Sequence, residues 1–416
     1  MIVQRPVSFL SVFVFLSLSA SCSGESASTI RESYTVRDSA GVEIVTNHRP
    51  QWQPGEEWRI ADDPDVELGQ LEGADVELFT TPSARLLADR RILVSEQSEK
   101  ELRLFSPDGT WLWTAGGKGE GPGEFKFLEK AQIVPGDTIL VFDRGLRRAT
   151  WFDSSGEFVR SVQVSTGDRS AFCRGVLDPN TWLFESMLPS SDSAGVSRWQ
   201  REIQLVGSAG IPLATLDTLT TDLSLSETKG NHSLIVTLPF FGRPIFAAGE
   251  GKAYITDNTS WEIRVFDQTG TFVRLIRRDW IRQPVTAGDI ELRLDRERGF
   301  QANWNQTEDQ NRAGLRLLEE GARRSASIPP LYQYWVDRVG NLWTLDWYMP
   351  EWPHPEREFN VFNPSGIWLG SVTVPAGMGL SDVGDDYVVA TVGDDLGVRR
   401  VRVHKLIKPA TTKQDS

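Results

Sequence analysis

Cysteine and histidine are scarce in this sequence, and their scarcity excludes several kinds of site. The chain of 416 residues holds 2 cysteines and 4 histidines. Cys22 falls at the end of an apolar leader, so Cys173 has no partner with which to build a disulfide framework. The histidines are scattered and show no spacing suited to zinc. We therefore expect no disulfide and no zinc site, and we interpret Cys173 as a small core residue.

Basic clusters and familiar catalytic motifs are lacking as well. The net charge is −13, from 57 acidic and 44 basic residues. An acidic chain without a basic patch is a poor partner for nucleic acid or for an anionic membrane surface. No Gly-x-Ser-x-Gly elbow occurs, and the glycine-rich run 116–123 lacks the Lys-Ser/Thr end of a phosphate loop. These absences favour a binding protein over an enzyme.

What the chain has instead is a repeated hairpin. Four segments share a Phe four residues before a Gly and an aromatic residue two residues after it: residues 105–111, 152–158, 266–272 and 362–368. The Gly suits a turn position with φ > 0, and the alternating residues beside it suit two paired strands. A second class of polar turn precedes each copy, which gives two hairpins, or four strands, per unit. A four-stranded unit that recurs is typical of a propeller blade.

The number and order of these units predict an all-β, six-bladed β-propeller over residues 34–408. The sixth unit is one strand short, so its outer edge would be exposed. We predict that an N-terminal strand, residues 42–46, completes the last blade and closes the ring. Residues 409–416 are predicted to form a polar tail.

One long insert interrupts the period at about residues 284–328. Thr286 and Asp289 have the spacing of a helix cap, and Leu315, Leu318 and Ala322 recur at helical intervals. We therefore predict a short helical insert between blades four and five, laid over one face of the ring.

The first twenty-one residues predict a signal peptide. Arg5 precedes an apolar run over residues 7–19, which is too short to span a membrane, and small residues then lead to Cys22. This arrangement resembles the lipobox of bacterial lipoproteins, although Ser19 stands where that family usually has Leu. The resemblance implies cleavage before Cys22 and acylation of its thiol. An ordinary secreted protein is the alternative. Residues 22–33 are predicted to be the lipidated N-terminus and its tether.

Three segments carry a resemblance to a known family. Residues 336–343, 263–267 and 116–125 are similar to NHL-repeat sequences, and residues 34–408 as a whole resemble exported bacterial six-bladed propellers of the NHL/TolB-like kind. The resemblance implies an exported protein. We further expect a monomer of the cell envelope that contacts the membrane through its lipid only. The resemblance implies little about activity, because this fold hosts hydrolases, lyases and binding proteins.

The second strand of five units ends in an acid. These acids are Glu96, Asp143, Glu185, Asp257 and Asp346. Gluconolactonase-like propellers hold Ca²⁺ with such ligands, and carboxylates are hard oxygen donors of the kind that Ca²⁺ prefers. The alternative is that each acid caps the turn that follows it. The recurrence in nearly every unit favours capping.

Exposed aromatic residues near a basic side chain mark a candidate binding face. Arg243, Trp347 and Tyr348 suit a peptide, protein or carbohydrate ligand, whereas the same aromatics could instead clamp the helical insert. We expect a membrane-anchored propeller that binds a ligand or protein partner without catalysis and without a cofactor. The alternative is a Ca²⁺-dependent lactonase or lyase with a site in the central channel.

Overall fold

The computed structural model describes residues 32–69, 82–167, 171–188, 191–193, 196–229, 232–301, 307–349, 355–393 and 398–409. Strands dominate this part of the chain, which also contains two helices. Among the described residues no helix is both long enough and apolar enough to cross a membrane. The predicted lipid attachment at Cys22 lies outside the described residues.

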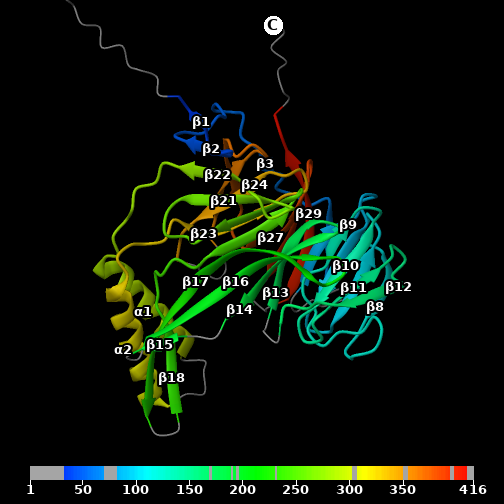
Figure 1. Cartoon of the computed structure of the whole chain (residues 1–416). Coiled ribbons are helices and arrows are strands. Elements are labelled where there is room, and N and C mark those ends of the chain that lie inside the picture. Colours follow the sequence, from blue (N-terminus) through cyan, green and yellow to red (C-terminus); the bar gives the residue numbers. More distant parts are fainter. Residues whose placement is uncertain are drawn as a thin grey trace, which may run out of the picture. The chain divides into compact units, whose positions relative to one another are not determined.

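The strands form six sheets, each of which we call a blade (Figure 1). Blade one comprises β5 (Pro82–Leu86), β6 (Ile92–Glu96), β7 (Glu101–Phe105) and β8 (Trp111–Gly116). Blade two comprises β9 (Gln132–Val134), β10 (Thr138–Asp143), β11 (Arg148–Phe152) and β12 (Phe158–Gln163). Blade three comprises β13 (Ala171–Asp178), β14 (Thr181–Met187), β15 (Ser191–Ser193), β16 (Val196–Gly207), β17 (Pro212–Lys229) and β18 (His232–Thr237).

The remaining blades follow the same antiparallel order. Blade four comprises β19 (Ile245–Gly249), β20 (Lys252–Thr256), β21 (Glu262–Asp267) and β22 (Phe272–Arg278). Blade five comprises β23 (Leu331–Val336), β24 (Leu342–Asp346), β25 (Arg357–Phe362) and β26 (Trp368–Val374). Blade six comprises β27 (Met378–Val383), β28 (Tyr387–Gly393) and β29 (Arg399–Ile407).

Apolar side chains fill the space between neighbouring blades. One cluster joins blades one and two through Leu102 and Ile139, and another joins blades five and six through Trp343. The same kind of packing joins blade six back to blade one, where Val389 meets Leu86. Since a sheet must cover both of its apolar faces, each blade is stabilised by the two blades beside it.

The repeated glycines occupy the left-handed turn positions that the sequence predicts. Gly109, Gly156, Gly270 and Gly366 have φ of 90°, 85°, 86° and 80°, which confirms that prediction. The structure adds a second reason for glycine at these turns. A Cβ on Gly156 would lie 2.8 Å from the ring of Trp113 in β8, the outer strand of the preceding blade. Each such turn therefore fits closely against its neighbour.

The predicted closing strand is wrong. Residues 42–46 lie in β2 (Val42–Asn47), which pairs in parallel with β22 of blade four and antiparallel with β1 (Tyr34–Ser39). Blade six receives its outer strand from later residues, because β29 pairs with β3 (Arg59–Ile60) and β4 (Val66–Leu68). We call residues 33–68 the N-terminal belt.

The side chain of Asn47 explains why β2 stays at blade four. Its amide nitrogen donates hydrogen bonds to the carbonyls of Arg277, at 3.0 Å, and Gly366, at 2.9 Å. Its oxygen accepts one from the backbone N–H of Trp368 at 2.8 Å. Asn47 is fully buried, so these bonds fix the end of β2 between blades four and five.

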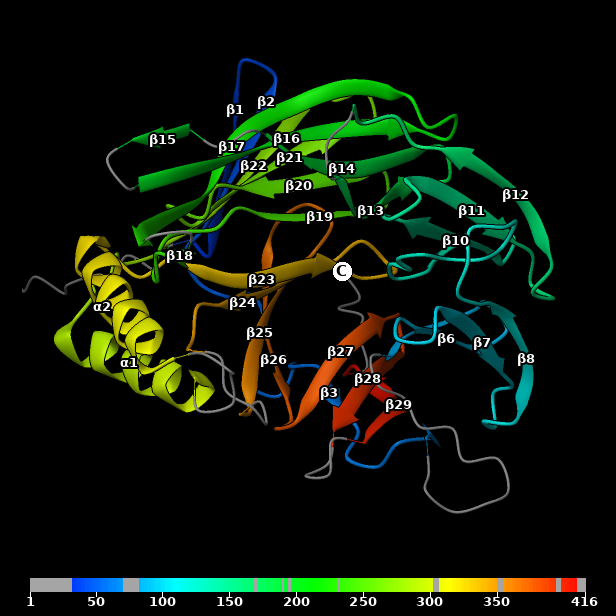
Figure 2. The ribbon, with the colours of Figure 1, turned by 90° about the horizontal axis from the view of Figure 1, so that it is seen from below.

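Two helices follow β22 and precede β23 in the chain. They are α1 (Ala287–Gln301) and α2 (Glu308–Arg324), and Figure 2 shows them to one side of the blades. The predicted cap is present, since the hydroxyl of Thr286 accepts a hydrogen bond from the N–H of Asp289 at 3.2 Å. Leu317 of α2 packs against Leu225 and Leu238, next to β17 and β18 of blade three.

Candidate ligand-binding channel

Residues from the first strands of the six blades, or next to them, line one cavity of about 480 Å³. Its lining includes residues of β5, β13, β19, β23 and β27 and the segment that leads into β9. Figure 2 shows β13, β19, β23 and β27 on the inner side of their blades. The charged lining residues are Arg85, Glu129, Lys130, Arg144, Arg174 and Asp382. Four cations thus face two acids in a protein whose net charge is −13. We call this cavity the channel.

Arg144 lies between two aromatic rings at one end of the channel. Its guanidinium carbon is 4.1 Å from the ring centre of Phe127 and 4.5 Å from that of Phe172. Such contacts are attractive, because the face of an aromatic ring is electronegative. Within the described part of the chain, Arg144 forms no ion pair. The rings therefore hold a cation whose N–H donors are left for another partner.

Three separate segments build this arrangement. Arg144 follows β10, Phe127 precedes β9, and Phe172 belongs to β13. Asp143 positions two of them, because its carboxylate accepts hydrogen bonds from the N–H groups of Phe127, at 3.1 Å, and Leu146, at 2.9 Å. Asp143 is buried, so the loop that carries Arg144 is held firmly.

Two further guanidinium groups surround Phe172. Arg174 and Arg201 lie 5.2 Å and 5.6 Å from its ring centre. Both arginines are bonded to the same oxygen of Glu185, whose side chain is buried. One carboxylate thus pairs with two guanidinium groups beside Phe172.

Glu129 and Lys130 extend the site toward the middle of the channel. The Glu129 carboxylate accepts a hydrogen bond from the N–H of Cys173 at 3.3 Å. Burial raises the pKa of Glu129 to about 7, although this N–H group, Arg174 and Arg144 act in the opposite direction. Lys130 lines the channel, and desolvation by the surrounding protein, together with the nearby Arg85, lowers its pKa. Lys130 forms no ion pair with any residue that the structure describes.

At the other end of the channel the arginines are paired with an acid. Asp382 receives Arg85 at 3.3 Å and Arg338 at 2.9 Å, and it also accepts hydrogen bonds from the N–H of Leu86 and the hydroxyl of Tyr387. These residues belong to blades one, five and six. The network therefore joins blades, and both of its guanidinium groups are paired with Asp382.

Three of the predicted calcium ligands accept hydrogen bonds from the turns beside them. Glu96 accepts the N–H of Ser98 at 3.0 Å, and Asp257 accepts that of Thr259 at 3.0 Å. Asp143 bonds to its own loop in the same manner. This is the geometry of a turn cap.

The other two predicted ligands contact arginines. Glu185 is bonded to Arg174 and Arg201, and Asp346 accepts a hydrogen bond from Arg278 at 2.6 Å. Among the described residues, no group of three or more histidines, cysteines and acids is placed to hold a metal ion. The calcium site remains a prediction.

The predicted ligand-binding residues lie away from the channel lining. The ring of Trp347 is 5.5 Å from that of Phe240, and the ring of Tyr348 is 4.7 Å from that of Tyr332. Arg243 is exposed. Their role as ligand contacts stays a prediction. The sequence patterns did not single out Phe127, Arg144 and Phe172. Their one signal in the sequence is that Arg144 directly follows Asp143, a predicted turn acid.

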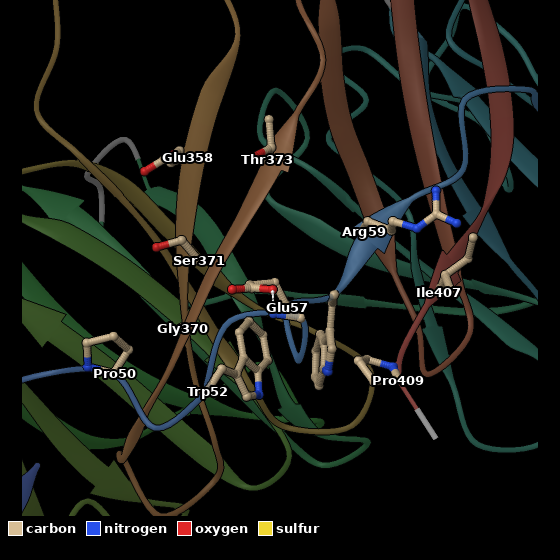
Figure 3. A pocket seen from close by; sticks show the side chains of 12 residues that line it. Pro50, Trp52, Glu57, Arg59, Glu358, Gly370, Ser371, Thr373, Ile407 and Pro409 are labelled. Atoms are coloured by element: carbon tan, nitrogen blue, oxygen red, sulfur yellow. Dashed lines mark hydrogen bonds between the residues drawn. The ribbon is translucent and has the colours of Figure 1, made fainter. Parts of the chain in front are cut away.

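A second cavity, of about 740 Å³, lies at the outer edge of blade five (Figure 3). Trp52 and Trp58 of the N-terminal belt line it, with ring centres 5.1 Å apart. Its charged residues are Glu57, Arg59 and Glu358. Trp52 fills the space beside Gly370, where a Cβ would come within 2.1 Å of the indole. This tryptophan therefore serves to pack the belt onto β26.

The comparisons with known proteins agree with a β-propeller fold. Residues 60–201 match a family model described as a 6-bladed beta-propeller. No curated protein matches the sequence.

Several solved structures are similar at low sequence identity. A Bacteroides fragilis protein whose name calls it exported has a TM-score of 0.47 and 12% identity, and the match covers 88% of this chain and 100% of that one. Virginiamycin B lyase from Staphylococcus aureus has a TM-score of 0.37 and 7% identity, with 84% and 100% covered. The calcium-binding protein regucalcin from Agrobacterium tumefaciens has a TM-score of 0.34 and 10% identity, with 82% and 96% covered.

Proposed function

We propose that this protein is an exported, lipid-anchored β-propeller that binds an anionic organic ligand in its central channel without transforming it. The observation that carries the proposal is Arg144, a cation held between Phe127 and Phe172 and without an ion pair among the described residues. The lipobox-like Cys22 and the NHL-like segments support the export and the family type.

The chemistry of the channel favours a carboxylate or a phosphate. Hydrogen bonds between ionised partners contribute about 1.5–3 kcal/mol, more than neutral ones do. Arg144 and Lys130 can both supply such bonds, and Arg174 adds positive charge beside them. A volume of about 480 Å³ lies within the range of small-molecule sites. We therefore expect a compact organic acid or phosphate ester.

Titration calorimetry with citrate and with inorganic phosphate as probes tests this proposal. We expect Arg144→Gln to weaken the binding of the better probe by about tenfold or more, because one charge-assisted hydrogen bond is lost. Arg312→Gln is the matched control, since Arg312 lies on α2 with 74% of its side chain exposed. Equal affinities of the wild type and Arg144→Gln, or no binding of either probe, would contradict the channel site.

A further inference from the structure

The N-terminal belt covers the outer edges of three blades. In blade four β2 pairs with β22, and in blade six β4 pairs with β29. In blade five the N–H of Trp52 donates a hydrogen bond to the carbonyl of Leu369 at 2.7 Å. The belt thus runs along the outer strands of blades four, five and six, where it satisfies some of the backbone groups that an edge otherwise leaves open.

The outer edges of the other three blades carry exposed apolar side chains. These side chains have exposed fractions from 39% to 60%. They are Trp111 and Leu112 on β8, Phe158 and Val159 on β12, Leu213 on β17, and Ile211 just before β17. The residues at the matching repeat positions of blades four and five are half-buried instead of exposed. They are Phe272, Val273, Trp368 and Leu369. The belt accounts for this difference, because it lies over these later blades.

The repeat also aligns two arginines. Arg160 in β12 and Arg274 in β22 each stand four residues after the turn glycine of their hairpin. Arg274 forms an ion pair at 2.6 Å with Glu43 of the belt. Arg160 lies 3.6 Å from the ring centre of Trp151 and forms no ion pair with any described residue. Blade two thus carries the same types of side chain at its outer edge as blade four does. In blade four a further strand, β2, pairs with this edge, whereas no described strand pairs with the edge of β12.

We propose that β12, at the outer edge of blade two, binds an extended segment of a partner protein. The segment adds in parallel to β12, as β2 adds to β22, and places a carboxylate against Arg160 and aliphatic side chains over Phe158 and Val159. Addition of a strand to a sheet edge is a common mode of peptide recognition, in which main-chain bonds give affinity and side-chain contacts give specificity.

Blade two suits this partner better than blade one does. The position of Arg160 is taken in blade one by Trp113, which packs against the turn at Gly156. An acidic residue in a docked strand has a cation to meet on β12 and none at the matching position of β8. The partner is therefore expected to carry Glu or Asp flanked by β-branched residues, as the belt carries Glu43 between Val42 and Ile44.

The belt itself supplies a defined probe. A labelled peptide with the sequence of residues 41–48, capped at both ends, is titrated into the full-length protein and followed by fluorescence anisotropy. We expect Arg160→Glu to weaken its binding at least tenfold, because the ion pair becomes a repulsion. A second peptide that carries Glu43→Lys should show the opposite preference and bind Arg160→Glu more tightly than wild type.

Controls separate this site from other occupants. Arg312→Glu introduces the same charge change on α2 and should leave peptide affinity unchanged. Hydrogen exchange should slow in β12 on peptide binding. Slowing in β22 instead, or affinity that does not respond to Arg160→Glu, would overturn the proposal. Self-association of the protein that Arg160→Glu abolishes would also overturn it, since the occupant would then be a second copy. Citrate binding in the channel is unaffected in either case, so the two proposals fail separately.

Discussion

At the scale of single residues, Glu129 places a protonation equilibrium inside the channel. Its pKa is raised to about 7 by burial, and it lies near Arg144 and Arg174. Below this pH the carboxyl is neutral and the cations remain available to an anion. Above it, the new negative charge competes with the ligand for the same guanidinium groups.

We therefore predict that the affinity for citrate falls as the pH rises through about 7. Calorimetry at pH 6.0 and pH 8.0, values chosen on either side of this pKa, should show citrate affinities that differ at least several-fold. A difference of this size is expected from one additional charge interaction. Glu129→Gln cannot ionise, so its affinity should change less between the two values. An equal pH dependence in Glu129→Gln would assign the effect to another group.

The turn glycines make a second prediction. Gly156 has φ of 85° and faces Trp113 at 2.8 Å, so Gly156→Val should lower the free energy of unfolding by about 1–3 kcal/mol or more. Gly121 is the control, because a Cβ there meets only the flexible end of Glu124 at 3.0 Å. Urea denaturation measures both. An equal loss in Gly121→Val would remove the special role of the turn.

These residues show what a single sequence can reveal. The turn glycines are predictable because φ > 0 and the aromatic spacing are local and recur in each blade. The position of Arg144 between two aromatic rings is not predictable, since Phe127 and Phe172 reach it from other segments of the chain. Likewise, no sequence feature near Glu129 indicates that its pKa is raised. The shift follows from burial, which only the assembled channel provides.

At the scale of elements, the belt shows where pattern alone fails. β2 and β4 are both short segments with apolar residues, and either could complete a blade. The repeat predicted one missing strand, and β2 matched it by position and apolar pattern. The pattern could not show that β2 adds in parallel beyond a complete blade, since this depends on the bonds of Asn47 to residues more than 200 positions away. The helical insert was predictable, because its cap and its spacing are local.

The outer strand of blade six carries a third prediction. Leu68 in β4 is 4% exposed and packs in the cluster that joins blades six and one. Leu68→Ala should therefore lower the free energy of unfolding by about 2–5 kcal/mol. Val36 in β1 is 52% exposed, so Val36→Ala should change it by no more than about 0.5 kcal/mol. Similar unfolding midpoints for the two variants would show that β4 is not needed to complete the blade.

At the scale of the whole molecule, the charge is unevenly distributed. The chain carries a net charge of −13, while cations outnumber acids in the channel lining. A cationic cavity in an acidic body concentrates the field where an anion can enter, and it discourages binding of anions elsewhere on the surface. Screening by salt should therefore weaken channel binding, whereas the packing between blades should be little affected.

The final prediction concerns the attachment of the molecule to a membrane. The apolar run before Cys22, followed by small residues, predicts lipidation of that thiol, and the sequence, with a net charge of −13, predicts little attraction to anionic lipid. The lipid would then be the sole anchor, and stable attachment needs more than one acyl chain. Cys22→Ala should move the protein from the membrane fraction to the soluble fraction and abolish fatty-acid labelling, with citrate binding unchanged. A wild-type protein found in the soluble fraction without labelling would refute the anchor and leave the channel proposal intact.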